Sequence, residues 1–273
     1  MTTVASTVTL PGGLTLSYAE QGDQSGPALV LLPGPTDSWR SYEPVLEAIP
    51  LSVRTIAVSQ RGHGDSDKPH TGYRVQDFAG DVVPLLDALD IERAVLAGHS
   101  GSCLVVRRVA IDRPERVLGL VLEASPTTLR GHPGLAAFVT SVVSSLHDPI
   151  DPDFARAFVV DTSSGQMGPK VVDRLAGELL KVPAHVWQET FAGLLDYDDL
   201  GELERITAPT MLIWGDGDGL VGRHMQEQLA ELIPNADLLV YSGIGHTPRW
   251  EDGSRFTSDV VAFVERIGRS LSS

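Results

Sequence analysis

Short apolar runs alternate with stretches of helical periodicity along the first half of the chain. The apolar runs, each of strand length, are residues 28–32, 53–59, 94–98 and 117–124. Apolar positions at helical spacing lie between them, over residues 39–49, 75–89 and 101–113. This alternation is typical of β-α-β units and predicts an α/β fold with a mostly parallel sheet flanked by helices. Ahead of it, residues 2–8 and 14–20 flank the turn Pro11-Gly12-Gly13 and predict an antiparallel hairpin.

The alternation stops after residue 125. Over residues 126–205 the apolar spacing is helical and no convincing strand appears. The repeating positions there are Leu135, Phe138, Val139, Val142, Val143, Leu146, Val171, Val172, Leu175, Leu179, Leu180, Trp187, Phe191 and Leu194. Strand-like runs return at residues 211–214 and 238–241, and helical patterns cover residues 222–233 and 254–270. We therefore expect one sheet domain, residues 1–125 and 206–273, with residues 126–205 as a helical insertion between its sixth and seventh strands.

Composition removes several classes of function. The 273 residues carry 36 acidic and 21 basic side chains, a net charge of -15, so nucleic acid is not an expected partner. A single cysteine, Cys103, excludes an internal disulfide and a cysteine-based metal site. The apolar runs are far shorter than the roughly 20 residues of a membrane helix, and residues 1–10 lack the basic and apolar regions of a secretory signal. We expect a cytoplasmic protein without a membrane partner, either a monomer or a homodimer.

The segment Gly98-His99-Ser100-Gly101-Ser102 lies between a predicted strand and a predicted helix. A serine on such a tight turn adopts strained backbone geometry, and small neighbours let its hydroxyl stand clear of the sheet edge. The start of the helix presents free N–H groups, led by that of Gly101, to a developing oxyanion. This context favours Ser100 as a nucleophile over the alternative of an ordinary glycine-containing turn.

A serine nucleophile requires a base and an orienting carboxylate. Among eight histidines, His246 follows the last predicted strand on the glycine-flanked loop 243–245, whereas His99 is expected to point away from Ser100. Asp216 and Asp218 follow the preceding strand and offer two carboxylates. The chain order Ser, Asp, His is that of hydrolases with a serine on a strand-to-helix turn.

Together these motifs resemble the α/β-hydrolase family, and the resemblance covers nearly the whole chain. The matching pieces are Leu31-Leu32-Pro33-Gly34, Arg61-Gly62-His63-Gly64-Asp65-Ser66, the turn around Ser100, Gly215-Asp216-Gly217-Asp218 and Gly245-His246. The resemblance implies an α/β-hydrolase fold with an eight-stranded sheet and a helical cap formed by the insertion. It also implies that Asp218, rather than Asp216, is the catalytic acid. Glu123, at the end of the sixth strand, is a rival because some relatives place the acid there.

Two positions depart from the family pattern. Ser102 takes the place of the last glycine of G-x-S-x-G. The second departure follows the third strand. Relatives commonly carry His-Gly after the third strand, and the next residue supplies the second N–H of the oxyanion hole. Here the pair is Pro33-Gly34 and the next residue is Pro35, which has no N–H. We therefore expect Thr36, through its amide or its hydroxyl, to act beside the amide of Gly101.

The resemblance implies an acyl-enzyme on Ser100 and requires neither a metal nor a cofactor. The sequence contains no G-x-x-x-x-G-K-[ST] phosphate loop and no H-E-x-x-H zinc motif. Large apolar side chains in the expected cap suggest an apolar pocket above the serine. The candidates for its wall are Phe138, Met167, Trp187, Phe191, Leu220 and Glu123. For each of the four residues in the expected cap, packing within the cap or against the sheet domain is the favoured alternative.

We expect a hydrolase of a carboxylic ester or lactone, acyl-homoserine lactones included, that acts on a small to medium apolar substrate. A carbon–carbon bond hydrolase or a perhydrolase would use the same three residues. A ligand-binding member of the fold with little hydrolytic activity is a third interpretation, for which Pro35 and Ser102 are the only support.

Overall fold

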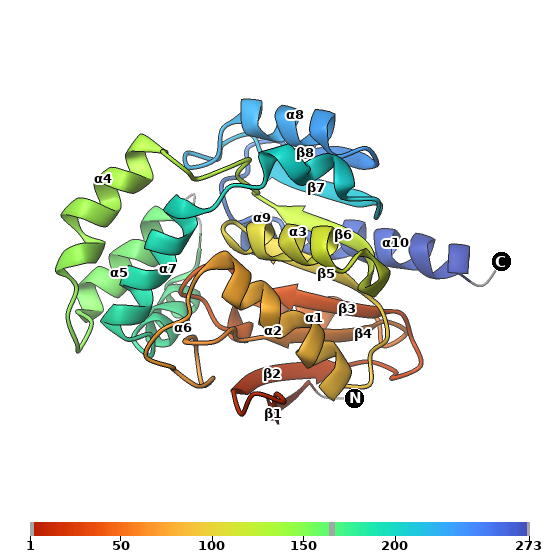
Figure 1. Ribbon diagram of the computed structural model, residues 1–273, viewed down its shortest axis with the longest axis horizontal. Helices are drawn as coiled ribbons and strands as arrows, with labels where there is room; N and C mark the ends of the chain where they lie inside the picture. The colour runs from red at the N-terminus through yellow and green to blue at the C-terminus, as the bar shows by residue number, and fades with distance from the viewer. Residues whose placement is uncertain (1–2, 164–166, 272–273) are drawn as a thin grey trace.

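The computed structural model describes residues 3–163 and 167–271 (Figure 1); Thr2, the first residue of the predicted hairpin, lies outside these ranges. Within them, eight strands form one sheet in the order β1-β2-β4-β3-β5-β6-β7-β8. The strands are β1 (Val4–Thr9), β2 (Thr15–Gln21), β3 (Ala28–Leu32), β4 (Arg54–Val58), β5 (Ala94–His99), β6 (Val117–Glu123), β7 (Thr210–Gly215) and β8 (Ala236–Tyr241). β1 and β2 form an antiparallel hairpin, β2 pairs antiparallel with β4, and the other pairs are parallel. The predicted mostly parallel sheet is confirmed.

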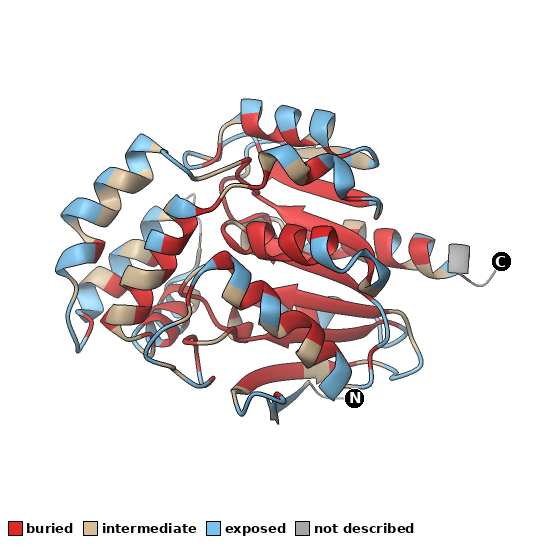
Figure 2. Ribbon diagram, in the orientation of Figure 1, coloured by how far each residue is buried: buried red, intermediate tan, exposed pale blue. Residues whose placement is uncertain are grey.

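Alternate residues of the central strands face two different helical layers. In β3, Val30 and Leu32 belong to one buried cluster, whereas Leu29 and Leu31 belong to the other, as the two-residue period of a strand requires. The first face is covered by α2 (Val75–Ala88), α3 (Ser102–Asp112) and α8 (Arg223–Leu232). The second is covered by η1 (Trp39–Tyr42), α1 (Glu43–Ala48) and α10 (Gly253–Leu271). The central strands are therefore buried on both sides (Figure 2).

The regular elements described between β6 and β7 are all helices, joined by loops. Its elements are α4 (Pro133–Ser141), η3 (Val143–Ser145), α5 (Pro152–Asp161), α6 (Pro169–Leu179), α7 (Ala184–Asp196) and η4 (Leu200–Arg205). The periodicity of the sequence predicts α4, α6 and α7 but not α5. These four helices lie together beside the sheet (Figure 1), and α4 contains no buried residue. No described helix combines the length and apolar character needed to cross a membrane.

Arg107 of α3 joins the two ends of this helical segment. Its guanidinium donates hydrogen bonds to the carbonyl oxygens of Pro126 (2.8 Å) and Thr127 (2.9 Å), where the chain leaves the sheet. It also forms an ion pair with Asp199, where the chain returns toward β7, and neither of the paired side chains is exposed. Both ends of the segment are thereby fixed to the same buried side chain. The short helices η2 (Pro114–Arg116) and α9 (Pro248–Glu251) complete the fold.

Candidate active site

Ser100 occupies a strained turn between β5 and α3. Its φ of 53° lies in the left-handed region, which is rare for residues other than glycine. The Ser100 amide donates to the carbonyl oxygen of Glu123 at 2.8 Å and so fixes the turn to the end of β6. The turn is also very tight, because a Cβ atom on Gly98 would lie 2.6 Å from the carbonyl oxygen of Ser102. A glycine at position 98 is therefore required by close approach of the backbone.

Three of the predicted residues meet at this turn. His246 Nε2 lies 3.0 Å from the Ser100 hydroxyl oxygen, and His246 Nδ1 lies 2.8 Å from Asp218 Oδ2. Asp218 has a fully buried side chain, and that of His246 is 7 % exposed. The three side chains come from loops at the carboxyl ends of β5, β7 and β8. In the sheet, β7 and β8 are neighbours, and β6 lies between β5 and β7. Parallel strands thus bring Ser100 together with two residues that are more than a hundred positions away from it in the chain.

Asp218 is held in position by backbone donors. Its second oxygen, Oδ1, accepts hydrogen bonds from the amides of Leu220 (2.8 Å) and Val221 (3.0 Å). These two bonds occupy Oδ1 and leave Oδ2 to face the imidazole of His246.

The loop that carries His246 is fixed by one carboxylate. Glu251 accepts hydrogen bonds from the amide of Gly245 (2.8 Å) and from the amide (3.1 Å) and hydroxyl (2.8 Å) of Thr247. Both neighbours of His246 are therefore attached to the same side chain on α9, which limits the movement of the imidazole.

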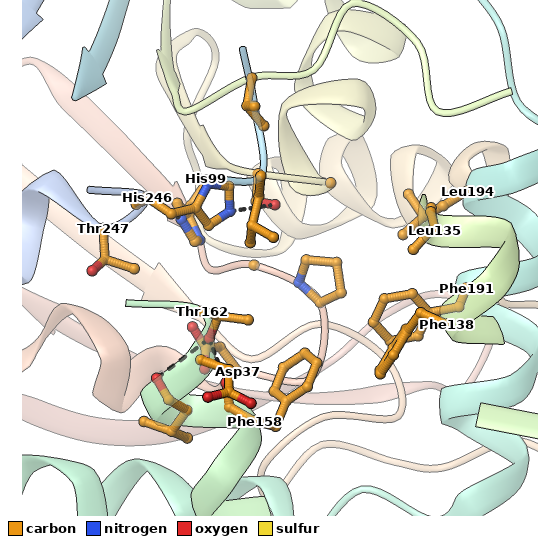
Figure 3. Close-up of a pocket in the computed structure, with 18 of the residues that line it drawn as sticks. Asp37, His99, Leu135, Phe138, Phe158, Thr162, Phe191, Leu194, His246 and Thr247 are labelled. Carbon is orange, nitrogen blue, oxygen red and sulfur yellow. Dashed lines mark hydrogen bonds between the residues drawn. The ribbon is translucent and has the colours of Figure 1, made fainter. Parts of the chain in front are cut away.

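A pocket of about 680 Å³ opens above Ser100 and His246. Of the predicted residues, Gly101, Pro35, Phe138, Phe191 and Leu220 line it. Figure 3 shows His99 and His246 on one side of this space, with Leu135, Phe138, Phe191 and Leu194 on the opposite side. The wall that faces the histidines is thus apolar and comes from α4 and α7.

The structure corrects three of the predicted wall residues. Trp187 is fully buried and stacks on Phe191, because it packs inside the helical segment and not against the cavity. Met167 packs on the buried cluster, and Glu123 pairs with the buried Arg249. Neither of these two side chains belongs to the wall of this pocket. Thr36, predicted as an oxyanion donor and not as a wall residue, is not among the lining residues either, although its neighbour Pro35 is.

Pro35 and Thr36 form the middle of a tight turn. The amide of Asp37 donates to the carbonyl oxygen of Gly34 at 3.1 Å, and Thr36 has a φ of 74°. Proline at the second position and a positive φ at the third define a type II turn, which normally has glycine at the third position. The Thr36 hydroxyl donates to the Pro35 carbonyl oxygen at 2.5 Å. The hydroxyl of Thr36 is therefore already engaged, whereas no hydrogen bond of its amide occurs within the described chain.

Ser102, which stands where the family pattern has glycine, links two loops. Its hydroxyl donates to the carbonyl oxygen of Pro33 at 2.6 Å and accepts from the amide group of Gln60 at 2.9 Å. Gln60 also donates to Pro33 at 3.2 Å. Ser102 therefore attaches the turn of Ser100 to the loop that follows β3.

Known proteins share this architecture. The profile of the family described as alpha/beta hydrolase fold matches residues 27–253. The chain belongs to this family. A non-heme chloroperoxidase of Streptomyces lividans is 28 % identical over 95 % of this chain and 99 % of its own length. A 2-(acetamidomethylene)succinate hydrolase of Mesorhizobium japonicum is 28 % identical over 86 % of either chain. Among solved structures, an esterase from Rhodococcus sp. ECU1013 matches with a TM-score of 0.83 and 27 % identity, over 96 % of this chain and 99 % of its own.

This α/β hydrolase carries a buried ionic cluster beside the pocket, which no pattern in the sequence indicates. Arg249 is fully buried and donates to Glu123 (3.2 Å), to Asp37 (3.1 Å) and to the hydroxyl of Ser41 (2.7 Å). Burial raises the pKa of Glu123, and the charge of Arg249 opposes this shift. Burial likewise raises the pKa of Asp37 to about 6, against the opposing effects of Arg249 and Ser41. Asp37, unlike Glu123, lines the pocket.

Replacing Asp37 with asparagine should remove a pH dependence of stability. The pKa of Asp37 is about 6 in the folded state and about 3.9 in the unfolded chain, so the folded state binds the proton more tightly. Between these two pH values the folded state is protonated to a greater extent than the unfolded chain. The wild type should therefore gain stability relative to Asp37→Asn as the pH falls from about 7 to about 4, by at most about 1.4 kcal/mol per pH unit. Denaturant titrations of both proteins across this range measure the effect, and a constant difference in free energy of unfolding would contradict it.

His99, which is predicted to point away from Ser100, lines the pocket of this hydrolase. Its ring centroid lies 5.0 Å from that of His246, and its Nε2–H donates to the His246 carbonyl oxygen at 3.0 Å (Figure 3). Burial, reinforced by the charge of Arg249, lowers the pKa of His99 well below its usual value. His99 is therefore a neutral ring that fixes the backbone of His246. Within the described chain, no cluster of three or more histidine, cysteine or acidic side chains has the arrangement of a metal site.

Proposed function

We propose that this α/β hydrolase is a serine hydrolase that cleaves a carboxylic ester or lactone through an acyl-enzyme on Ser100. The observation that carries the proposal is the continuous chain of contacts Ser100 to His246 (3.0 Å) to Asp218 (2.8 Å) at the pocket. In this scheme His246 Nε2 takes the proton of the Ser100 hydroxyl as its oxygen attacks the acyl carbon. Asp218 keeps the other ring proton on Nδ1 and stabilises the imidazolium. His246 then returns its proton to the leaving alcohol, and water later hydrolyses the acyl-enzyme.

Two backbone amides are proposed to stabilise the oxyanion. The Gly101 amide stands at the start of α3 and makes no hydrogen bond within the described chain. Pro35 packs over Gly101, since its Cγ lies 2.8 Å from where a Cβ of Gly101 would be, but it has no N–H. We assign the second donor to the Thr36 amide, because the Thr36 hydroxyl is engaged by Pro35.

Substitutions at Thr36 should separate the amide from the hydroxyl. Thr36→Gly keeps the amide, removes the hydroxyl and suits the positive φ of 74°, so turnover of 4-nitrophenyl acetate should stay within about threefold of wild type. Thr36→Val, the matched control, should keep similar turnover but lose stability, because its branched side chain lacks the bond to Pro35. A fall of about 10²- to 10³-fold in both variants would show that the hydroxyl is the donor. A phosphonate adduct whose oxygen lies beyond hydrogen-bonding distance of the Thr36 amide would exclude the amide.

The pocket supports a small to medium apolar acyl or alkyl group. Its volume of about 680 Å³ falls in the range of sites that enclose small molecules, and residues of α4, α5 and α7 supply an apolar wall. We propose that residues 126–205 act as a cap that shapes the substrate. Rates for linear esters and lactones of increasing acyl length measure this shape, and a rate that does not vary with length would count against it.

A fluorophosphonate probe tests the proposed chemistry directly. Wild-type protein should be labelled with one probe per chain, and Ser100→Ala, which keeps the turn and loses the nucleophile, should not be labelled. Absence of labelling in folded wild-type protein would instead favour a ligand-binding role for the fold.

Perhydrolysis is a second candidate, favoured by the similarity to the non-heme chloroperoxidase of Streptomyces lividans. Hydrogen peroxide in place of water would attack the acyl carbon and release a peracid, with Ser100 recovering its proton from His246. Peracid formation from an ester in the presence of hydrogen peroxide, compared between wild type and Ser100→Ala, distinguishes this activity from plain hydrolysis.

A further inference from the structure

The carboxyl group of Asp37 is a charged group in the wall of a mainly apolar pocket. It belongs to the same turn as Pro35, whose ring packs over Gly101 beside the nucleophile. The Asp37 side chain is 11 % exposed and lines the pocket together with Gly34 and Pro35. Asp37 therefore lies close to the bound substrate of the proposed reaction.

Only one of the two oxygens of Asp37 has a partner in the described structure. Oδ2 accepts from the Ser41 hydroxyl and from Arg249 Nη2, each at 3.1 Å. Oδ1 has no hydrogen bond to any described residue. Oδ1 is not enclosed by protein atoms, so a donor that enters the pocket can reach it.

Glu123 shows that a carboxylate can bind Arg249 without leaving one of its oxygens unpaired. Both oxygens of Glu123 bind Arg249, Oε1 through the backbone amide (2.9 Å) and Oε2 through Nη1 (3.2 Å), and the Glu123 side chain is 1 % exposed. Asp37 uses one oxygen for the same anchor and leaves the other toward the cavity. The free oxygen of Asp37 is therefore a feature of the pocket.

The charges around Asp37 favour a donor from the ligand. Arg249 is the one cation that contacts Asp37 or Glu123 in the described structure, and it forms an ion pair with each of them. When both carboxylates are ionised, the cluster therefore has one excess negative charge. Glu178 adds a further negative influence on Asp37. The pKa of Asp37, which burial raises to about 6, agrees with a carboxylate that lacks one of its donors.

We propose that Asp37 is a specificity-determining residue that binds a hydrogen-bond donor, an ammonium or hydroxyl group, on an otherwise apolar substrate. The inference rests on the proposed hydrolytic function in that the donor group and the scissile ester occupy the same pocket. It changes the expected substrate from a purely apolar ester to one with a single polar head.

Matched esters test the proposal through a selectivity ratio. The substrates are 4-nitrophenyl hexanoate and its 3-hydroxy, 6-hydroxy and 6-amino derivatives. Wild-type protein should prefer at least one donor-bearing ester by about tenfold in kcat/KM, mainly through KM, and Asp37→Asn should abolish that preference. In this variant the side-chain oxygen is expected to remain with Arg249, so the NH₂ group replaces the acceptor that faced the pocket. Asp153→Asn, at an exposed acidic position of α5 that does not line the pocket, is the matched control and should keep the wild-type ratio. Equal ratios in Asp37→Asn and wild type overturn the proposal.

Binding to wild-type protein gives a test that does not depend on how the variant folds. Calorimetry measures the affinities of hexylammonium, hexan-1-ol and 1-methoxyhexane for the wild-type protein. Salt at about 0.3 M screens the net negative charge of the protein, which would otherwise favour the cation. Tightest binding of the ammonium identifies a cationic head, and tightest binding of the alcohol identifies a hydroxyl. Equal affinity of the ether, which accepts but does not donate, overturns the proposal. Because binding requires no turnover, this result is independent of the fluorophosphonate test of hydrolysis.

Discussion

Replacing Asp218 with asparagine should lower kcat for an activated ester by about 10⁴-fold while the fold is kept. The asparagine oxygen is expected to stay with the amides of Leu220 and Val221, which both donate to Asp218 Oδ1. The NH₂ group then faces His246 Nδ1, where Oδ2 now lies. A donor at that place makes Nδ1 the acceptor and moves the ring proton to Nε2. His246 can then no longer take the proton of Ser100.

Asp216 provides the matched control for this experiment. Its carboxylate accepts from the amide of Gly243 and the hydroxyl of Ser242, so it supports the loop without touching the imidazole. Asp216→Asn should reduce kcat by less than about tenfold, measured with 4-nitrophenyl butanoate alongside circular dichroism of each variant. If Asp218→Asn remains active and Glu123→Gln loses the activity instead, the catalytic acid is Glu123.

Replacing Arg107 with methionine should lower the free energy of unfolding by about 3–5 kcal/mol. The substitution leaves the carboxylate of Asp199 buried without its cation and removes the donor from the carbonyl oxygens of Pro126 and Thr127. Buried groups that lose their partner in this way bear the full cost of desolvation. Denaturant unfolding followed by tryptophan fluorescence measures the change.

The next residue of α3 supplies the control. Arg108 pairs with Asp112 and Glu202, whose side chains are 55 % and 38 % exposed, so Arg108→Met should cost about 1 kcal/mol or less. Adding Asp199→Leu to Arg107→Met should restore part of the lost stability, because it removes the uncompensated charge. Equal losses for the two arginine variants would contradict the special role of Arg107.

The sheet could be predicted from the sequence because its signals are local. Residues 28–32, for example, form an unbroken apolar run, and β3 covers the same residues, Ala28–Leu32. Residues 152–161 give a weaker signal, since α5 buries only Ala155 and Val159 and its other apolar side chains remain partly exposed. Without a wide buried face, the periodicity of this helix is difficult to detect.

The contacts among Ser100, Asp218 and His246 could be anticipated because each residue stands in a recognisable turn after a strand. The cluster of Arg249 and Asp37 has no such signal, since the two residues are 212 positions apart and lie in segments without a shared pattern. Helical spacing also cannot tell a side chain that lines a cavity from one that packs between helices. Phe191 and Trp187, one turn apart on α7, have the same pattern, and only Phe191 reaches the pocket.

The hydroxyl of Ser102 has a consequence for motion near the reacting atoms. Ser102 bonds to Pro33, and both share the partner Gln60, so the turn of Ser100 and the loop after β3 are attached to each other as well as to the sheet. Thermal displacement of one loop should therefore carry the other with it. The distance between the Ser100 hydroxyl oxygen and the amides proposed for the oxyanion should vary less than the width of the surrounding cavity. The cavity can then adjust to different substrates while this distance is kept.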